Sequence, residues 1–171
     1  MYQPIVEAGL KAEYLDVADG KLNFSADELK KKLDAGANIK AVIIQNTLGY
    51  VCDIENIAAI CRQNNIILIE DLAHSAGAMY LNGQEAGTVG DFVILSFSQD
   101  KIIDAVSGGA LVVRNKKYQN LQLPKIAQPA KKQQVKDRFY PNFTFKIRMD
   151  YLIGLGKFTH KIYKKLFEIF H

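Results

Sequence analysis

The sequence has no tryptophan and only four prolines and two cysteines among its 171 residues. Cys52 and Cys61 are too few for a disulfide framework, and they lack the close spacing of metal ligands. No apolar run approaches the roughly 20 residues that a membrane-spanning helix needs. The N-terminus has no basic segment followed by an apolar stretch, so no secretory signal is visible. We therefore expect a reduced, cytoplasmic protein with one sizeable core.

Charge is distributed unevenly along the chain. Residues 1–113 carry 8 Lys and Arg against 15 Asp and Glu, a net charge of −7, whereas residues 114–171 carry 14 against 3, a net charge of +11. A change of this size predicts a boundary. We expect a globular domain over 1–113 and a basic connector with an amphipathic helix over 114–171.

Apolar patterns predict the strands of the first part. Alternation predicts a short strand over 12–17, and continuous apolar runs predict strands buried on both faces over 40–46 and 66–69. Two further strands are predicted over 91–97 and 109–113. These strands, alternating with helices, indicate an α/β fold with a mostly parallel sheet flanked by helices.

Two helices are predicted from their capping residues and spacing. Ser25 and Glu28 form a capping box, in which Glu28 is expected to reach back to the first turn. Asp53 is the expected cap of the second helix, whose apolar residues recur at helical spacing. This second helix lies between the strands at 40–46 and 66–69 and makes a βαβ unit with them.

The basic part gives weaker signals. Residues 116–142 are polar, contain three prolines, and predict an irregular or partly helical connector. From Tyr151 onward, apolar residues at steps of three and four predict a basic amphipathic helix. Its apolar stripe comprises Leu152, Leu155, Phe158, Ile162, Leu166 and Ile169.

Two polar groups follow buried strands. Asp71 and His74 come directly after the strand at 66–69, and Ser96 and Lys101 follow the strand that begins at residue 91. Ligands of open α/β sheets bind beyond the carboxyl ends of the strands, so these side chains are expected at one edge. Pyridoxal phosphate (PLP) needs this set of groups: a lysine amine, a carboxylate for the pyridinium nitrogen, and hydroxyls for the phosphate.

Taken in order, these residues resemble a known family. The stretch ILIEDLAHSAGAMYLNGQEAGTVGDFVILSFSQDKIIDAVSGGALVV is similar to the core of the DegT/DnrJ/EryC1/StrS aminotransferases, which are PLP enzymes of fold type I that act on sugar nucleotides. The resemblance covers about residues 4–113. It implies part of the large domain of such an enzyme.

The resemblance assigns a role to each of the four residues. Asp71 matches the acid that pairs with the pyridine nitrogen, and His74 matches the position beside the ring. Ser96 matches a phosphate contact, and Lys101 matches the lysine that holds PLP as a Schiff base. The implied reaction moves an amino group from an amino-acid donor, glutamate in most of the family, to a keto-sugar nucleotide.

The resemblance also implies what this chain lacks. Family members are about twice as long, and the sequence shows neither the preceding phosphate-binding helix N-terminus nor a small C-terminal domain. Family sites are built from two subunits, so a homodimer or a complementing chain is expected. We also expect little or no turnover by this chain alone, and apolar surface at the uncovered edge of the sheet.

Two questions remain open, one about the function of the whole chain and one about the basic helix. The chain is either an aminotransferase domain or a non-catalytic remnant of the same fold that serves as an interaction module. The basic helix is either a contact with an anionic membrane surface or a segment that packs on the sheet domain or a partner. Nucleic-acid binding is not expected, because no recognition motif accompanies the positive charge.

Overall fold

The computed structural model describes residues 2–123 and 125–169, with side chains as far as residue 165. Nine named helices and strands lie in this part of the chain, besides two short 3-10 turns. They are α1 (Tyr2–Glu7), α2 (Ala26–Asp34), β1 (Ala41–Gln45), α3 (Ile54–Gln63), β2 (Ile67–Asp71), β3 (Phe92–Ser96), β4 (Gly109–Val113), α4 (Lys131–Leu152) and α5 (Gly156–Ile169).

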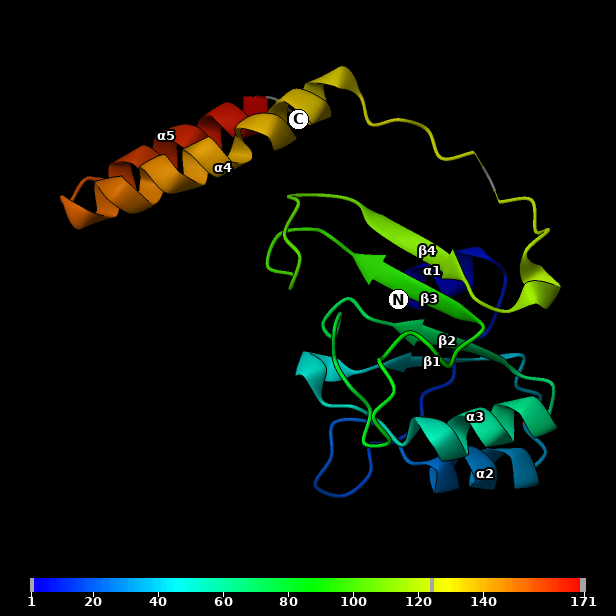
Figure 1. Ribbon diagram of the computed structural model, residues 1–171. Coiled ribbons are helices and arrows are strands. Elements are labelled where there is room, and N and C mark those ends of the chain that lie inside the picture. The colour runs from blue at the N-terminus through cyan, green and yellow to red at the C-terminus, as the bar shows by residue number, and fades with distance from the viewer. Residues whose placement is uncertain (1, 124, 170–171) are drawn as a thin grey trace.

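The strands form one sheet in the order β1-β2-β3-β4. β1, β2 and β3 are parallel, and β4 runs antiparallel to β3. The prediction of a mostly parallel α/β sheet is confirmed, as is the βαβ unit that α3 makes with β1 and β2. Figure 1 shows α2 and α3 together on one side of the sheet, with the α4–α5 hairpin beyond β4.

The strand predicted over 12–17 is wrong. This segment runs without regular secondary structure, and no strand of the described residues pairs with it. Its alternation has a different cause, since Leu15 packs against the core while Glu13 and Tyr14 are exposed. Burial over this segment recurs at every third residue rather than at every second one, and no neighbouring strand offers the backbone partners that a strand needs.

The two faces of the sheet are buried to different extents. On the face toward α3, Ile44, Leu68 and Val93 are buried. On the opposite face, Ile43 and Ile94 are only half-buried and Leu111 is exposed. The prediction that the strands at 40–46 and 66–69 are buried on both faces is therefore wrong for this chain, because Ile43, Ile67 and Ile69 are only half-buried.

Both predicted helix starts are confirmed. The Ser25 hydroxyl accepts a hydrogen bond from the backbone N–H of Glu28 at 3.2 Å, and the Asp53 carboxylate accepts from the N–H of Asn56 at 3.4 Å. The capping box is only half formed, however, because the Glu28 carboxylate accepts from Lys31 Nζ at 2.6 Å instead of reaching back. The ion pair with the next turn is close enough to compete with the cap.

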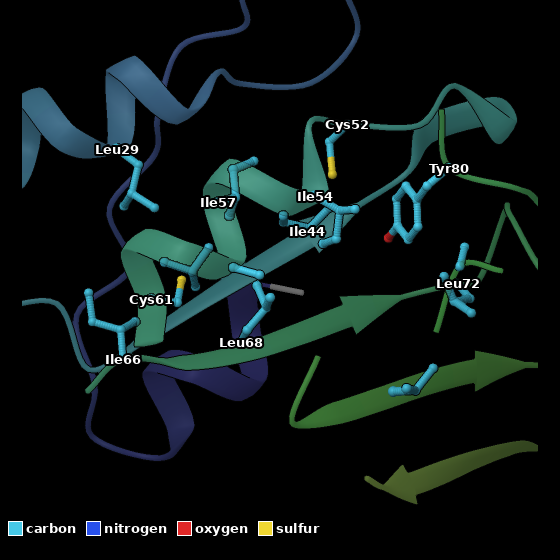
Figure 2. Packing of buried hydrophobic residues seen from close by; sticks show 14 residues of the cluster. Leu29, Ile44, Cys52, Ile54, Ile57, Cys61, Ile66, Leu68, Leu72 and Tyr80 are labelled. Carbon is cyan, nitrogen blue, oxygen red and sulfur yellow. The ribbon is translucent and has the colours of Figure 1, made fainter. Parts of the chain in front are cut away.

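The core lies between the sheet and the two helices α2 and α3. Ile57 and Cys61 of α3 are buried together with Leu68 of β2, and Leu29 of α2 is buried in the same cluster (Figure 2). Burial raises the pKa of Cys52 to about 12 and that of Cys61 to about 11. Both cysteines are free and buried, so they act as small apolar core residues.

The basic part forms a helical hairpin. α4 begins at Lys131, inside the connector that was predicted over 116–142, and continues through Pro141. Tyr151 therefore lies in the last turn of α4 rather than at the beginning of the last helix, which is α5. Proline removes one helical hydrogen bond, but packing between the two helices outweighs that local cost: the rings of Phe143 and Tyr163 lie 4.6 Å apart.

Part of the predicted apolar stripe lies outside the described side chains, namely Leu166 and Ile169. Within the described residues, no helix is both long and apolar enough to cross a membrane.

One residue of the loop between β3 and β4 has an unfavourable backbone. Val106 adopts a φ of 71°, in the left-handed region that β-branched residues rarely occupy. Its N–H donates to the Asp104 carboxylate at 2.8 Å, which holds this conformation.

Replacing Val106 with glycine is expected to stabilise the protein by about 1 kcal/mol, because relief of the left-handed strain exceeds the entropic cost of glycine. Urea unfolding measures the change. The matched control is Val112→Gly in β4, where the backbone is extended and the side chain packs against the core, so stability should fall. A Val106→Gly protein less stable than the parent would contradict the strain argument.

Candidate functional site

The carboxyl ends of β2 and β3 bring Asp71 and Ser96 to one face of the sheet. Asp71 is paired with Ile94 in the parallel ladder, and Ser96 lies two residues beyond Ile94 on the same side. The main chain joins the two strand ends directly, since the N–H of Leu72 donates to the carbonyl of Ile94 at 2.8 Å. Sheet register thus fixes the positions of both residues.

The Asp71 carboxylate is buried, with 5% of the residue exposed, and it is only partly used by the fold. Its Oδ1 accepts a hydrogen bond from the backbone N–H of Ala73 at 2.9 Å, which closes the turn after β2. Among the described residues, nothing donates to Oδ2. One carboxylate oxygen therefore shapes the turn, and the other accepts no hydrogen bond from the described residues.

His74 and Lys101 come together from two different loops. Lys101 Nζ lies 3.1 Å from His74 Nε2, and both side chains are half-buried. An ammonium group has donors only, so a charged Lys101 requires His74 Nε2 to accept, with the imidazole proton on Nδ1. This contact joins the turn after β2 to the loop after β3.

Two hydroxyls meet at the end of β3. Ser96 Oγ and Ser98 Oγ lie 3.1 Å apart, and both residues are half-buried. The backbone N–H of Lys101 donates to the carbonyl of Ser98 at 3.3 Å, so the hydroxyl pair and the lysine belong to one compact turn. Ser98 was not predicted as a site residue, although the Ser-x-Ser spacing places it beside Ser96.

The structure brings the four predicted site residues together as two pairs. His74 and Lys101 are in contact, and Asp71 and Ser96 share a sheet face. No hydrogen bond or ion pair joins Asp71 to Lys101 within the described chain. A group that touched all four would have to lie between them.

Glu70, the residue before Asp71, points to the opposite face of β2 and is fully buried. Its Oε2 accepts from the Tyr80 hydroxyl at 2.7 Å and from the N–H of Gly87 at 2.6 Å. Its Oε1 accepts from the N–H of Val89 at 2.9 Å and from that of Gly90. Four donors around one carboxylate satisfy its buried charge.

This network extends to the turn after β1. The Tyr80 hydroxyl accepts from Asn46 Nδ2 at 3.0 Å, and Asn46 Oδ1 accepts from the N–H of Cys52 at 3.1 Å. Burial and the hydrogen bond to Glu70 raise the pKa of Tyr80 well above its ordinary value, so the phenol stays protonated and donates. Sequence reasoning gave Glu70 no role of its own. The available signal was a glutamate on the core-facing side of a buried strand.

A separate groove of about 950 Å³ lies away from these residues. It is bordered by the loop around Asn23, by the first turns of α3 and by the loop around Leu81. None of Asp71, His74, Ser96 and Lys101 lines it. Of the polar cluster at the ends of β2 and β3, Asp71 is buried and the other three side chains are half-buried.

Comparison with known proteins gives a consistent match. Residues 1–157 match the family described as the DegT/DnrJ/EryC1/StrS aminotransferase family, which uses PLP. The chain is 32% identical over 108 residues to GDP-perosamine synthase of Vibrio cholerae, covering 63% of this chain and 29% of that protein. It is also 32% identical over 115 residues to UDP-4-amino-4,6-dideoxy-N-acetyl-beta-L-altrosamine transaminase of Campylobacter jejuni, covering 64% and 29%.

A solved structure shows the same fold. The aminotransferase TlmJ from Streptoalloteichus hindustanus superposes with a TM-score of 0.60 at 34% identity, over 66% of this chain and 30% of that protein. The four-stranded sheet and its helices therefore correspond to part of a fold-type-I aminotransferase. The chain spans about 29% of the length of the two curated relatives named above.

The Glu70 network generates a stability prediction. Glu70→Gln places an amide NH₂ against two of the four donors, so we expect a loss of about 3 kcal/mol in the free energy of unfolding. Tyr80→Phe removes one donor and leaves the three backbone N–H groups in place, so the loss should be about 1–2 kcal/mol. Denaturant unfolding of both variants checks this order. A Glu70→Gln protein at least as stable as Tyr80→Phe would show that the carboxylate does not hold the loop.

Proposed function

Because the chain belongs to the DegT/DnrJ/EryC1/StrS aminotransferase family, we propose that the edge around Lys101 is the cofactor-binding part of a PLP-dependent aminotransferase site. The proposed reaction transfers an amino group from an amino-acid donor, glutamate, to a keto-sugar nucleotide. The observation that carries the proposal is the 3.1 Å contact between Lys101 Nζ and His74 Nε2, at the edge that also carries Asp71 and Ser96.

The side chains fit PLP in chemical type. Lys101 offers an amine for the carbonyl carbon, Asp71 offers an unused carboxylate oxygen for a ring N–H, and Ser96 and Ser98 offer hydroxyls for phosphate oxygens. When bound, PLP supplies an electron sink that stabilises negative charge on the carbon beside the transferred nitrogen.

Lys101 has two proposed tasks. As an amine it holds the cofactor covalently through Nζ. When it is not bonded to the cofactor, the same Nζ would take up and return a proton as a general base and acid. The 3.1 Å contact with His74 Nε2 is proposed to orient the Lys101 amine.

Asp71 is proposed to hold a proton on the ring nitrogen. Its carboxylate is buried and its turn is fixed through Oδ1, so Oδ2 can accept a charge-assisted hydrogen bond without rearrangement. The Ser96 and Ser98 hydroxyls are proposed to donate to phosphate oxygens.

The wider assembly is also proposed. The acidic part, 1–113, carries these four residues, and the basic part, 114–171, forms a separate unit. A homodimer or a complementing chain in the cytoplasm would contribute further residues to the site, and no nucleic acid is involved. The alternative is a non-catalytic interaction module of the same fold, which is favoured if the chain fails to bind PLP.

Covalent labelling tests the role of Lys101. The chain is incubated with PLP, reduced with borohydride and digested, and the modified lysine is identified by mass spectrometry. We expect saturable labelling of Lys101, lost in Lys101→Arg and retained in Lys40→Arg, which changes an exposed lysine before β1. Labelling spread over surface lysines, with Lys101 unmodified, would favour the non-catalytic alternative.

A PLP titration tests Asp71. A charge-assisted hydrogen bond contributes about 1.5–3 kcal/mol, so Asp71→Asn is expected to weaken PLP binding by about 10- to 100-fold. Asp100→Asn is the matched control: the same chemical change on an exposed residue beside Lys101, with a left-handed backbone that asparagine accepts. It should alter affinity by less than about twofold. Equal effects of the two substitutions would remove the assignment of Asp71.

A further inference from the structure

The turn between α4 and α5 exposes a cluster of large apolar side chains. We call residues 151–158 the hairpin tip. Leu152 is 78% exposed, Ile153 69% and Phe158 68%, and Tyr151 and Leu155 are also more than half exposed. Single exposed apolar residues are ordinary, but a contiguous cluster of this kind marks an interaction surface.

The hairpin tip is a turn that defined hydrogen bonds hold in place. The buried Asp150 carboxylate accepts from Lys146 Nζ and from Thr159 Oγ1, each at 2.6 Å, and thereby ties α4 to α5. The Asp150 carbonyl accepts from the N–H of Leu155 at 2.8 Å, and Gly154 turns the chain with a φ of +80°. The hydrogen bonds from Lys146 and Thr159 hold the pKa of Asp150 below its usual range, so the carboxylate keeps its charge at lower pH than an ordinary aspartate does.

Cations surround the apolar cluster. Residues 146–165 contain six Lys and Arg against one Asp, a net charge of +5. On α5, Lys157, Lys161 and Lys164 follow one another at steps of four and three, so they form a row along one side. Phe158 and Ile162 form the neighbouring row and are exposed. The lysine stems can lie along the apolar row while their charges face outward.

We propose that the hairpin tip binds the surface of a lipid bilayer containing anionic lipids. Leu152, Ile153 and Phe158 would enter the boundary between headgroups and acyl chains, and the surrounding lysines would pair with lipid phosphates and carboxylates. This inference is independent of the proposed aminotransferase function, because the tip shares no residue with the Lys101 edge.

The composition of the tip and its place at the end of the hairpin favour a bilayer over a protein partner. The cores of protein interfaces are depleted in lysine, whereas Phe158 and Ile162 each follow a lysine directly. The tip is also the free end of the hairpin, and it lies away from the sheet (Figure 1). The competing occupant is the acidic part, residues 1–113, of a second copy.

Vesicle co-sedimentation of the full 171-residue chain tests the proposal. The vesicles are phosphatidylcholine alone, or phosphatidylcholine with phosphatidylserine at a ratio of about 3:1. We expect binding to the anionic vesicles, weakened by added salt, and little binding to phosphatidylcholine alone. Absence of binding to the anionic vesicles overturns the proposal.

Three double variants distinguish insertion of the hairpin tip into the bilayer from non-specific hydrophobic adsorption. Leu152→Ser with Ile153→Ser should weaken binding by about tenfold or more, since two exposed apolar side chains no longer insert. Lys157→Gln with Lys161→Gln should weaken it by about tenfold through lost attraction to anionic lipid. The control, Leu81→Ser with Ile126→Ser, removes apolar residues that are 96% and 93% exposed outside the hairpin, and should change binding less than about twofold.

Two further outcomes would overturn the proposal. Binding that depends on the lysines and not on Leu152 and Ile153 means adsorption without insertion. Self-association in the absence of lipid that the Leu152→Ser, Ile153→Ser variant abolishes, without vesicle binding by the parent, means that the tip contacts a second copy. Helix content measured by circular dichroism confirms that each variant remains folded.

Discussion

The buried carboxylate of Glu70 is the constraint on which the site depends. A carboxylate without partners in the core would cost several kilocalories per mole, so its four donors must be present in the folded chain. Three of them are backbone N–H groups of residues 87–90, and Gly90 is close enough to Glu70 that a side chain there would crowd it. The loop before β3 is consequently shaped around a residue of β2.

Glu70 and Asp71 are consecutive residues whose side chains lie on opposite faces of the sheet. Successive residues of a strand point to opposite faces, so Glu70 anchors β2 on the core side while Asp71 faces the side proposed to bind the ligand. The hydrogen bonds from Asn46 and Tyr80 extend the anchor to the turn after β1. The proposed ring-binding acid therefore sits on a rigid strand end, whereas Lys101 sits on a loop whose contact with His74 links it to that strand.

In the α4–α5 hairpin, too, a buried carboxylate holds two segments together by accepting hydrogen bonds from both. There, Asp150 gathers Lys146 and Thr159 at a turn, as Glu70 gathers the donors around it. A second direct tie holds the start of α4 to the loop after β3, where Ser107 Oγ donates to Asp137 Oδ2 at 2.7 Å.

The sequence by itself determined the strands of the sheet, the caps of α2 and α3, and the identity of the residues at the strand ends. These features depend on local periodicity, on short-range hydrogen bonds and on an ordered motif, all of which are written in neighbouring residues. The segment over 12–17 shows the limit of this reasoning, because its alternation is real but no strand lies beside it to accept the pairing.

Tertiary structure decided the remaining features. The continuation of α4 through Pro141 depends on packing against α5, and the half-open face of the sheet depends on which elements cover it. The contact of His74 with Lys101 joins residues 27 positions apart, and the Glu70 network joins β2 to the loop after β1 and to the loop before β3. Such contacts form only when the sheet brings the strand ends together, so local sequence patterns name the residues without stating which of them touch.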